Sequence, residues 1–65
     1  MIIARTATDT LFKTSAGRYL LTQGGGEVFG RSKLDRSHAA GTIEYWINKA
    51  DDLVIENEEE VDKLL

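Results

Sequence analysis

The chain has 65 residues, no cysteine, no proline and one histidine, and it carries a formal net charge of −3. This length predicts one domain, residues 1–65, and the composition excludes disulfides and a zinc site made of cysteine and histidine. A domain this small buries only about 60% of the surface of its unfolded chain, so we expect a protein partner or a second copy, as in a homodimer, to support it.

The first residues, Met1 to Arg5, lack the charged start and the long apolar run that characterise a signal peptide. No apolar stretch of the sequence approaches the roughly 20 residues that a membrane span needs. Together with the absence of cysteine, these features predict a cytoplasmic protein that makes no use of a membrane.

Residues 2–14 are rich in β-branched side chains, which favour a strand over a helix. Their spacing predicts that Ile3, Ala7 and Leu11 share one face of the strand, although the alternation is imperfect. A break near Asp9 would give two short strands in place of one. Both readings stay open from the sequence.

Glycines divide the next part of the chain. Gly17 favours a turn over residues 15–17 because it can adopt a positive φ, and a second strand is expected over 18–23. The three glycines at 24–26 predict a hairpin loop that leads into a third strand over 27–33. A phosphate-binding loop would instead require the start of a helix and a Gly-Lys-Ser/Thr sequence, and neither follows.

The spacing of apolar residues then changes to three and four, which predicts an amphipathic helix over 38–50. Asp35 or Ser37 can cap its N-terminus. Gly41 is unfavourable inside a helix by roughly 1 kcal/mol relative to alanine, and we expect close packing on the sheet to explain it. The apolar stripe of this helix consists of Ala39, Ala40, Ile43, Trp46, Ile47 and Ala50.

The C-terminal part predicts a short strand and a short helix. Residues 53–55 form either a brief fourth strand or a linker. Asn57 is expected to cap the final helix, with Glu60 placed as in a capping box. The element order is therefore βββαβα or βββαα. We predict an α+β fold, in which a small antiparallel sheet of three to four strands packs one face against the main amphipathic helix and the short C-terminal helix.

The charged side chains are divided unevenly. Residues 1–36 carry six basic and three acidic side chains, whereas residues 37–65 carry two basic and eight acidic ones. Such a division indicates an electrostatic partner for one half, or an acidic recognition surface on the other. The spacing of a calcium-binding loop is absent, so the C-terminal acids form a solvated face or a surface for a basic partner. The candidate partner-binding residues are Tyr45, Asp51, Asp52, Glu56, Glu58, Glu59, Glu60 and Asp62.

An alternative surface for nucleic acid lies on or beside the predicted sheet. Its basic residues are Arg5, Lys13, Arg18, Arg31, Lys33 and Arg36. Tyr19 and Phe29 lie among them and could stack on the bases of a single strand. The negative net charge weighs against this reading, because nucleic-acid-binding domains are usually basic overall.

No catalytic, metal or cofactor motif stands out. His38 is the single histidine, and a role as general base would require an oriented carboxylate such as Glu44 in a concave pocket. We therefore expect a non-enzymatic protein-interaction or regulatory module without cofactors, of the accessory or inhibitor-like kind found in microbes or phages. It would present its acidic C-terminal surface to a basic partner, with nucleic-acid binding by the basic sheet face as the alternative.

Overall fold

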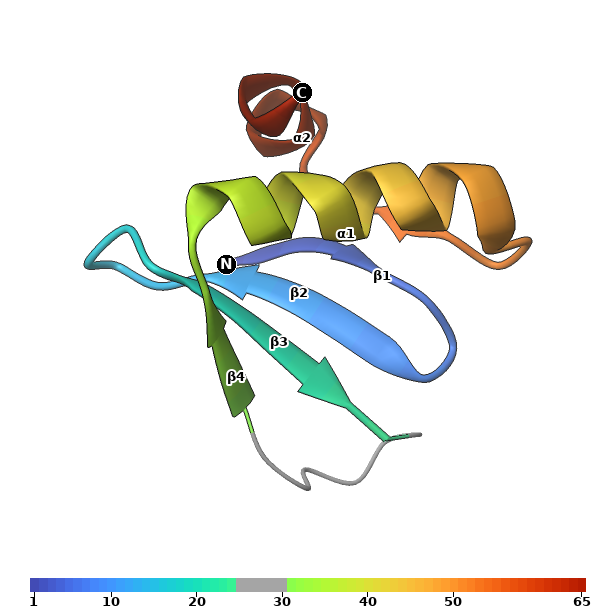
Figure 1. Cartoon of the computed structure of the whole chain (residues 1–65), viewed down its shortest axis with the longest axis horizontal. Helices are drawn as coiled ribbons and strands as arrows, with labels where there is room; N and C mark the ends of the chain where they lie inside the picture. Colours follow the sequence, from blue (N-terminus) through green and yellow to red (C-terminus); the bar gives the residue numbers. More distant parts are fainter. Residues whose placement is uncertain (25–30) are drawn as a thin grey trace.

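The structure is a computed structural model, and it describes residues 1–24 and 31–65 (Figure 1). The described chain forms a five-stranded antiparallel sheet and two helices, which confirms the α+β class with more strands than the three to four expected. The sheet order is β4-β3-β2-β1-β5. The elements are β1 (Ile2–Arg5), β2 (Asp9–Lys13), β3 (Tyr19–Gln23), β4 (Arg31–Leu34), α1 (Arg36–Lys49), β5 (Val54–Ile55) and α2 (Glu58–Leu64).

The N-terminal segment folds back on itself, so it forms two strands rather than one. The Thr6 amide donates to the Asp9 carbonyl at 2.9 Å, and the Asp9 amide donates to Thr6 Oγ1 at 3.1 Å. These bonds close a tight turn between β1 and β2. Ala7 lies in this turn and is exposed, so the prediction that it shares the buried face with Ile3 and Leu11 is wrong.

A bulge in β1 turns two successive apolar side chains toward the helices. Ile2 pairs with Phe12, while Ala4 pairs with Leu11, so Ile3 is an extra residue between the two pairs. Ile3 and Ala4 are both fully buried. A regular strand would send one of these two side chains to the opposite face of the sheet, and the bulge avoids this.

The turn that follows β2 forms as the sequence predicts. Gly17 adopts a φ of +79°, and its amide donates to the Thr14 carbonyl at 2.9 Å. Gly24, the first of the three glycines, also has a positive φ. The rest of the predicted glycine loop, residues 25–26, and the first part of the predicted third strand, residues 27–30, lie outside the described residues.

Helix α1 begins after Asp35, whose carboxylate accepts from the His38 amide at 2.8 Å. Of the two candidate caps, Asp35 is therefore the one used. The predicted apolar stripe is too wide, because Ile47 is 50% exposed. The explanation offered for Gly41 is also wrong, since this residue is exposed and a Cβ atom placed on it would meet nothing within 4 Å.

The C-terminal segment completes both layers of the fold. Strand β5 pairs with β1 through Ala4 and Ile55, so the segment 53–55 is not a linker. Asn57 caps α2 by accepting from the Glu60 amide at 3.0 Å. The Asn57 amide donates to the Ile3 carbonyl, so the reciprocal bond of a capping box, which the Glu60 side chain would make, does not form.

Both helices contribute to one core with the sheet (Figure 1). Figure 1 shows α1 crossing the sheet and α2 viewed end-on beside α1. The core residues are Ile3, Ala4, Leu11, Ala39, Ile43, Trp46, Val61 and Leu64. No helix in the described parts of the chain is long and apolar enough to cross a membrane.

Candidate functional site

One acidic residue of the predicted recognition surface is directed into the fold. Glu60 is only 6% exposed, and Lys13 Nζ donates to both of its carboxylate oxygens, at 2.9 and 3.1 Å. This hydrogen bond lowers the pKa of Glu60 and raises the pKa of Lys13, in each case against the opposing effect of desolvation. The Glu60 carboxylate is therefore occupied within the chain while α2 is docked.

Further polar contacts join the acidic C-terminal segment to the basic N-terminal half. Glu56 Oε1 lies 3.5 Å from Arg5 Nε, and Asp52 Oδ2 accepts from the Ala7 amide at 2.7 Å. Arg36 Nη2 donates to the carbonyl of Lys63 in the last turn of α2. Part of the charge division that the sequence displays thus serves to dock one half of the chain on the other.

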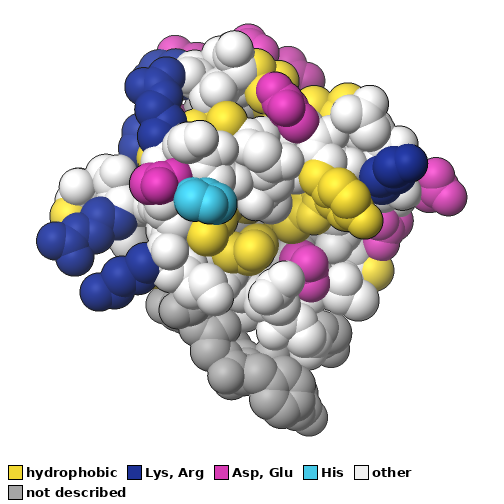
Figure 2. All heavy atoms as spheres, viewed as in Figure 1, with side chains coloured by type: hydrophobic (Ala, Val, Ile, Leu, Met, Phe, Trp, Pro, Cys, Tyr) yellow, Lys and Arg dark blue, Asp and Glu magenta, His cyan; other side chains and the backbone are white. Residues whose placement is uncertain are grey.

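Three of the remaining C-terminal acids are exposed and form an outward face on α2. Helix α2 buries Glu60, Val61 and Leu64, which share one side of the helix. The opposite side carries Glu58, Glu59 and Asp62, which we call the acidic face. These three side chains form no ion pair within the described parts of the chain. Figure 2 shows Asp and Glu side chains gathered along the top of this view, over α2.

Tyr45 and two other acids lie elsewhere. Tyr45 is 64% exposed and borders a groove of about 240 Å³ between α1 and the turn that joins β1 to β2. Asp52 also borders this groove, together with Lys49. Asp51 is exposed in the turn after α1. The structure therefore does not gather all the predicted partner-binding residues on one surface.

The six basic residues of the alternative surface are also dispersed. Arg5, Lys13 and Arg36 make the internal contacts described above, and the side chain of Arg31 lies outside the described part of the structure. Arg18 and Lys33 have no ion-pair partner among the described residues. Most Lys and Arg side chains of the face drawn in Figure 2 lie on its left side.

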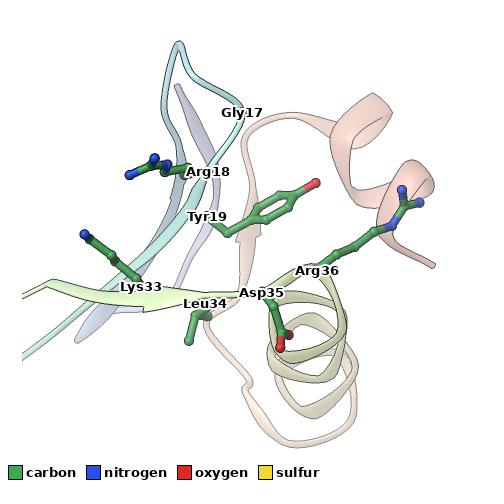
Figure 3. Close-up of a pocket in the computed structure, with 7 residues that line it drawn as sticks. All are labelled: Gly17, Arg18, Tyr19, Lys33, Leu34, Asp35 and Arg36. Carbon is green, nitrogen blue, oxygen red and sulfur yellow. The ribbon is translucent and has the colours of Figure 1, made fainter.

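A groove of about 420 Å³ lies where β3 begins and β4 ends (Figure 3). We call it the basic groove, and it is bordered by Gly17, Arg18, Tyr19, Lys33, Leu34, Asp35 and Arg36. Figure 3 shows that Arg18 and Lys33 point to one side of the sheet, whereas Tyr19 and Arg36 point to the other, toward α2.

Tyr19 does not supply a stacking surface beside the free cations. Its ring is partly buried against the core and lies 5.8 Å from Lys13 Nζ, on the helix side of the sheet. Phe29, the second aromatic residue proposed for stacking, lies outside the described residues. The described part of the basic sheet face therefore offers cations without the aromatic platform that single-strand binding commonly uses.

His38 lies in the first turn of α1 with its side chain 75% exposed, and it borders neither groove. Its Nδ1 is 2.8 Å from Asp35 Oδ1. The hydrogen bond from the His38 amide, followed by the one to its ring, lowers the pKa of the Asp35 carboxylate. The carboxylate that contacts the His38 ring is therefore that of the helix cap, Asp35, and not that of Glu44. Three-residue spacing at a helix start could have revealed this pair in the sequence.

Among the described residues, no three His, Asp or Glu side chains come close enough together to hold a metal ion. Comparison of the chain with models of known protein families, with curated proteins and with solved structures finds no match. The surfaces described above are therefore the basis for any statement about function.

Proposed function

We propose that this chain is a small, non-enzymatic interaction module, which binds a basic surface of a partner protein through the acidic face of α2. One observation carries the proposal. Helix α2 is fixed to the sheet by its buried side, and Glu58, Glu59 and Asp62 remain exposed on the other side without an ion-pair partner in the described chain.

The rest of α2 supports a recognition role because it holds the acidic face in place. Asn57 caps the helix, Glu60 bonds to Lys13, and the Lys63 carbonyl accepts from Arg36. Three carboxylates on one short, anchored helix attract a basic surface over a long range and lose little freedom on binding. The alternative role of the acids in the first turn is purely structural: negative charge near a helix N-terminus interacts favourably with the helix dipole and stabilises the helix.

This proposal implies how such a module would regulate its partner. A cluster of carboxylates can occupy a basic groove that otherwise receives phosphate groups. The module would then act as an accessory or inhibitory protein that competes with an anionic ligand. Nucleic-acid binding by this chain itself has weaker support, because three of its basic residues are engaged internally and Tyr19 faces the helices.

The test starts from affinity capture in a native lysate, with and without nuclease, followed by calorimetry with the purified partner. The acidic-face variant combines Glu58→Gln, Glu59→Gln and Asp62→Asn. Its matched control combines Asp9→Asn, Glu44→Gln and Asp51→Asn, which remove the same charge elsewhere. We expect the acidic-face variant to bind about tenfold more weakly and with a flatter salt dependence. Equal affinities of the two variants would refute the proposal.

A further inference from the structure

Strand β4 is the edge of the sheet and leaves one side of its backbone open. The sheet order ends at β4, which pairs with β3 on its inner side. No other strand in the described parts of the chain lies along its outer side. An open edge presents backbone N–H and C=O groups that can pair with another chain.

The hairpin between β2 and β3 determines which backbone groups of β3 face β4. The Thr14 amide donates to the Arg18 carbonyl at 2.8 Å, so these residues form a hydrogen-bonded pair. Bonded and non-bonded pairs alternate along an antiparallel ladder. The backbone groups of Arg18 and Leu20 therefore face β2, whereas those of Tyr19 and Leu21 face β4.

The same alternation identifies the open groups of β4. Tyr19 pairs with Leu34, and Leu21 pairs with Ser32, so the backbone groups of Leu34 and Ser32 are directed toward β3. The N–H and C=O groups of Lys33 consequently point outward, as do those of Arg31 two residues earlier. No described residue forms a backbone hydrogen bond with these outward groups.

Side chains next to this edge give it a charge pattern. Lys33 pairs with Leu20 and points to the side of the sheet away from the helices, in the same direction as Arg18 (Figure 3). Leu34 lies on the other side and is packed partly against the core. An added strand would therefore meet the Lys33 cation on one side and the apolar Leu34 at the next position on the other.

A second copy of this chain is a poor occupant of the edge. When two β4 strands pair symmetrically about Ser32 or Lys33, facing residues share one side of the sheet. Lys33 would then lie opposite Arg31 or Lys33 of the second copy. Like charges that face each other across two strands are destabilising, and lysine is common on edges that natural proteins protect from self-pairing.

We propose that the outer edge of β4 binds an extended segment of a partner protein in which acidic and apolar residues alternate. The segment adds to the sheet as a further strand next to β4, with a carboxylate beside Lys33 and an apolar side chain beside Leu34. This site is separate from the acidic face of α2 and does not depend on it.

A peptide suits this edge better than a nucleic acid does. The outward N–H and C=O groups of Lys33 match the acceptors and donors of another extended backbone, whereas the phosphate backbone of a nucleic acid supplies acceptors alone. Tyr19 provides no stacking surface next to Arg18 and Lys33, because its ring lies on the helix side.

The experiment uses a labelled synthetic peptide of sequence Glu-Val-Glu-Val-Glu, the full chain and NMR. We expect the peptide to slow exchange of the Lys33 amide hydrogen, and the corresponding lysine peptide Lys-Val-Lys-Val-Lys to have no effect.

Lys33→Gln removes one charge and should weaken peptide binding about threefold. Lys33→Pro also removes the outward N–H, which an edge strand tolerates, and should weaken it about tenfold. Lys49→Gln is the control and should leave the affinity unchanged.

Three results would overturn the inference. The first is no slowing of Lys33 amide exchange at saturating peptide, and the second is equal affinity of Lys33→Pro and Lys49→Gln for the peptide. The third is a single-stranded oligonucleotide that displaces the peptide and binds Lys33→Pro as tightly as it binds the original chain. Unchanged amide spectra outside β4 and its neighbours would verify that each variant is folded. The acidic-face variant should retain peptide binding, so failure here and failure of the proposed function can be told apart.

Discussion

Lys13 and Glu60 are separated by 47 residues in the sequence, yet Lys13 Nζ donates to both Glu60 carboxylate oxygens. The contact fastens α2 to β2 and takes one acidic residue out of the C-terminal charged surface. Because the Glu60 side chain is buried, removal of Lys13 leaves its carboxylate with only the longer contact to Lys63 Nζ at 3.8 Å, and removal of Glu60 leaves Lys13 without its hydrogen-bonded partner.

We expect Glu60→Gln and Lys13→Met each to lower the midpoint of thermal unfolding by about 5 °C. In the double variant the loss should be smaller than the sum of the two single losses, because the second substitution removes a charge that the first left without its hydrogen-bonded partner. Thermal unfolding, followed by circular dichroism, gives the midpoints of the original chain, the two single variants and the double variant. Strict additivity would contradict the role given to this pair.

Stability should fall in acid because of Glu60. Its pKa is lower in the folded chain than the ordinary glutamate value of 4.5, so the folded state favours the ionised form. This contribution is present above the unfolded pKa and is lost as the pH falls through the folded pKa. Asp35, whose pKa is also lowered, acts in the same direction. Urea unfolding midpoints across acidic pH should decline less steeply for Glu60→Gln than for the exposed control Glu58→Gln.

Two glycine substitutions should have opposite effects. Gly41 lies in an exposed part of α1 with open space where a Cβ would be, so Gly41→Ala should stabilise the fold by about 0.5–1 kcal/mol. Gly17 has a φ of +79°, and Gly17→Ala should destabilise the fold by about 1 kcal/mol despite the open space around it. Chemical unfolding gives the free energy of unfolding of both variants. A lower value for Gly41→Ala than for the original chain would refute this account of α1.

Removal of the α2 cap should have a local effect. Asn57→Ala deletes the side-chain oxygen that accepts from the Glu60 amide, at a cost of about 1 kcal/mol. We expect faster hydrogen exchange in α2 and little change in β2 and β3. Asn48→Ala, which removes an exposed asparagine in the last turn of α1, serves as the control. Equal exchange in α2 for both variants would contradict the assignment of Asn57 as the cap.

Local signals allowed several features to be predicted from the sequence. The Gly17 turn and the helix caps at Asp35 and Asn57 depend on residues within three or four positions of each other. The turn at residues 6–8 contains neither glycine nor proline and is stabilised instead by the hydrogen bond that Thr6 Oγ1 accepts from the Asp9 amide. The sequence therefore did not distinguish one long strand from two short ones.

Long-range features could not be read from the sequence in the same way. Nothing near Glu60 indicates that a lysine from β2 will cover it, and by position it belongs to the acidic surface. The bulge at Ile3 depends on the register between β1 and β2, which the alternation of residues 2–14 does not specify. The division of the acids into docked and exposed groups therefore becomes visible only in three dimensions.

The most direct test of the proposed function is site-specific photo-crosslinking in a native lysate, with benzoylphenylalanine in place of Asp62 on the acidic face. The same probe in place of the exposed Thr8, in the turn between β1 and β2, is the control. We predict that the probe at position 62 crosslinks a defined basic protein, that added salt or the remaining acidic-face substitutions suppress the crosslink, and that position 8 does not form it. A crosslink of equal yield from both positions, or one indifferent to salt, would contradict recognition through the acidic face.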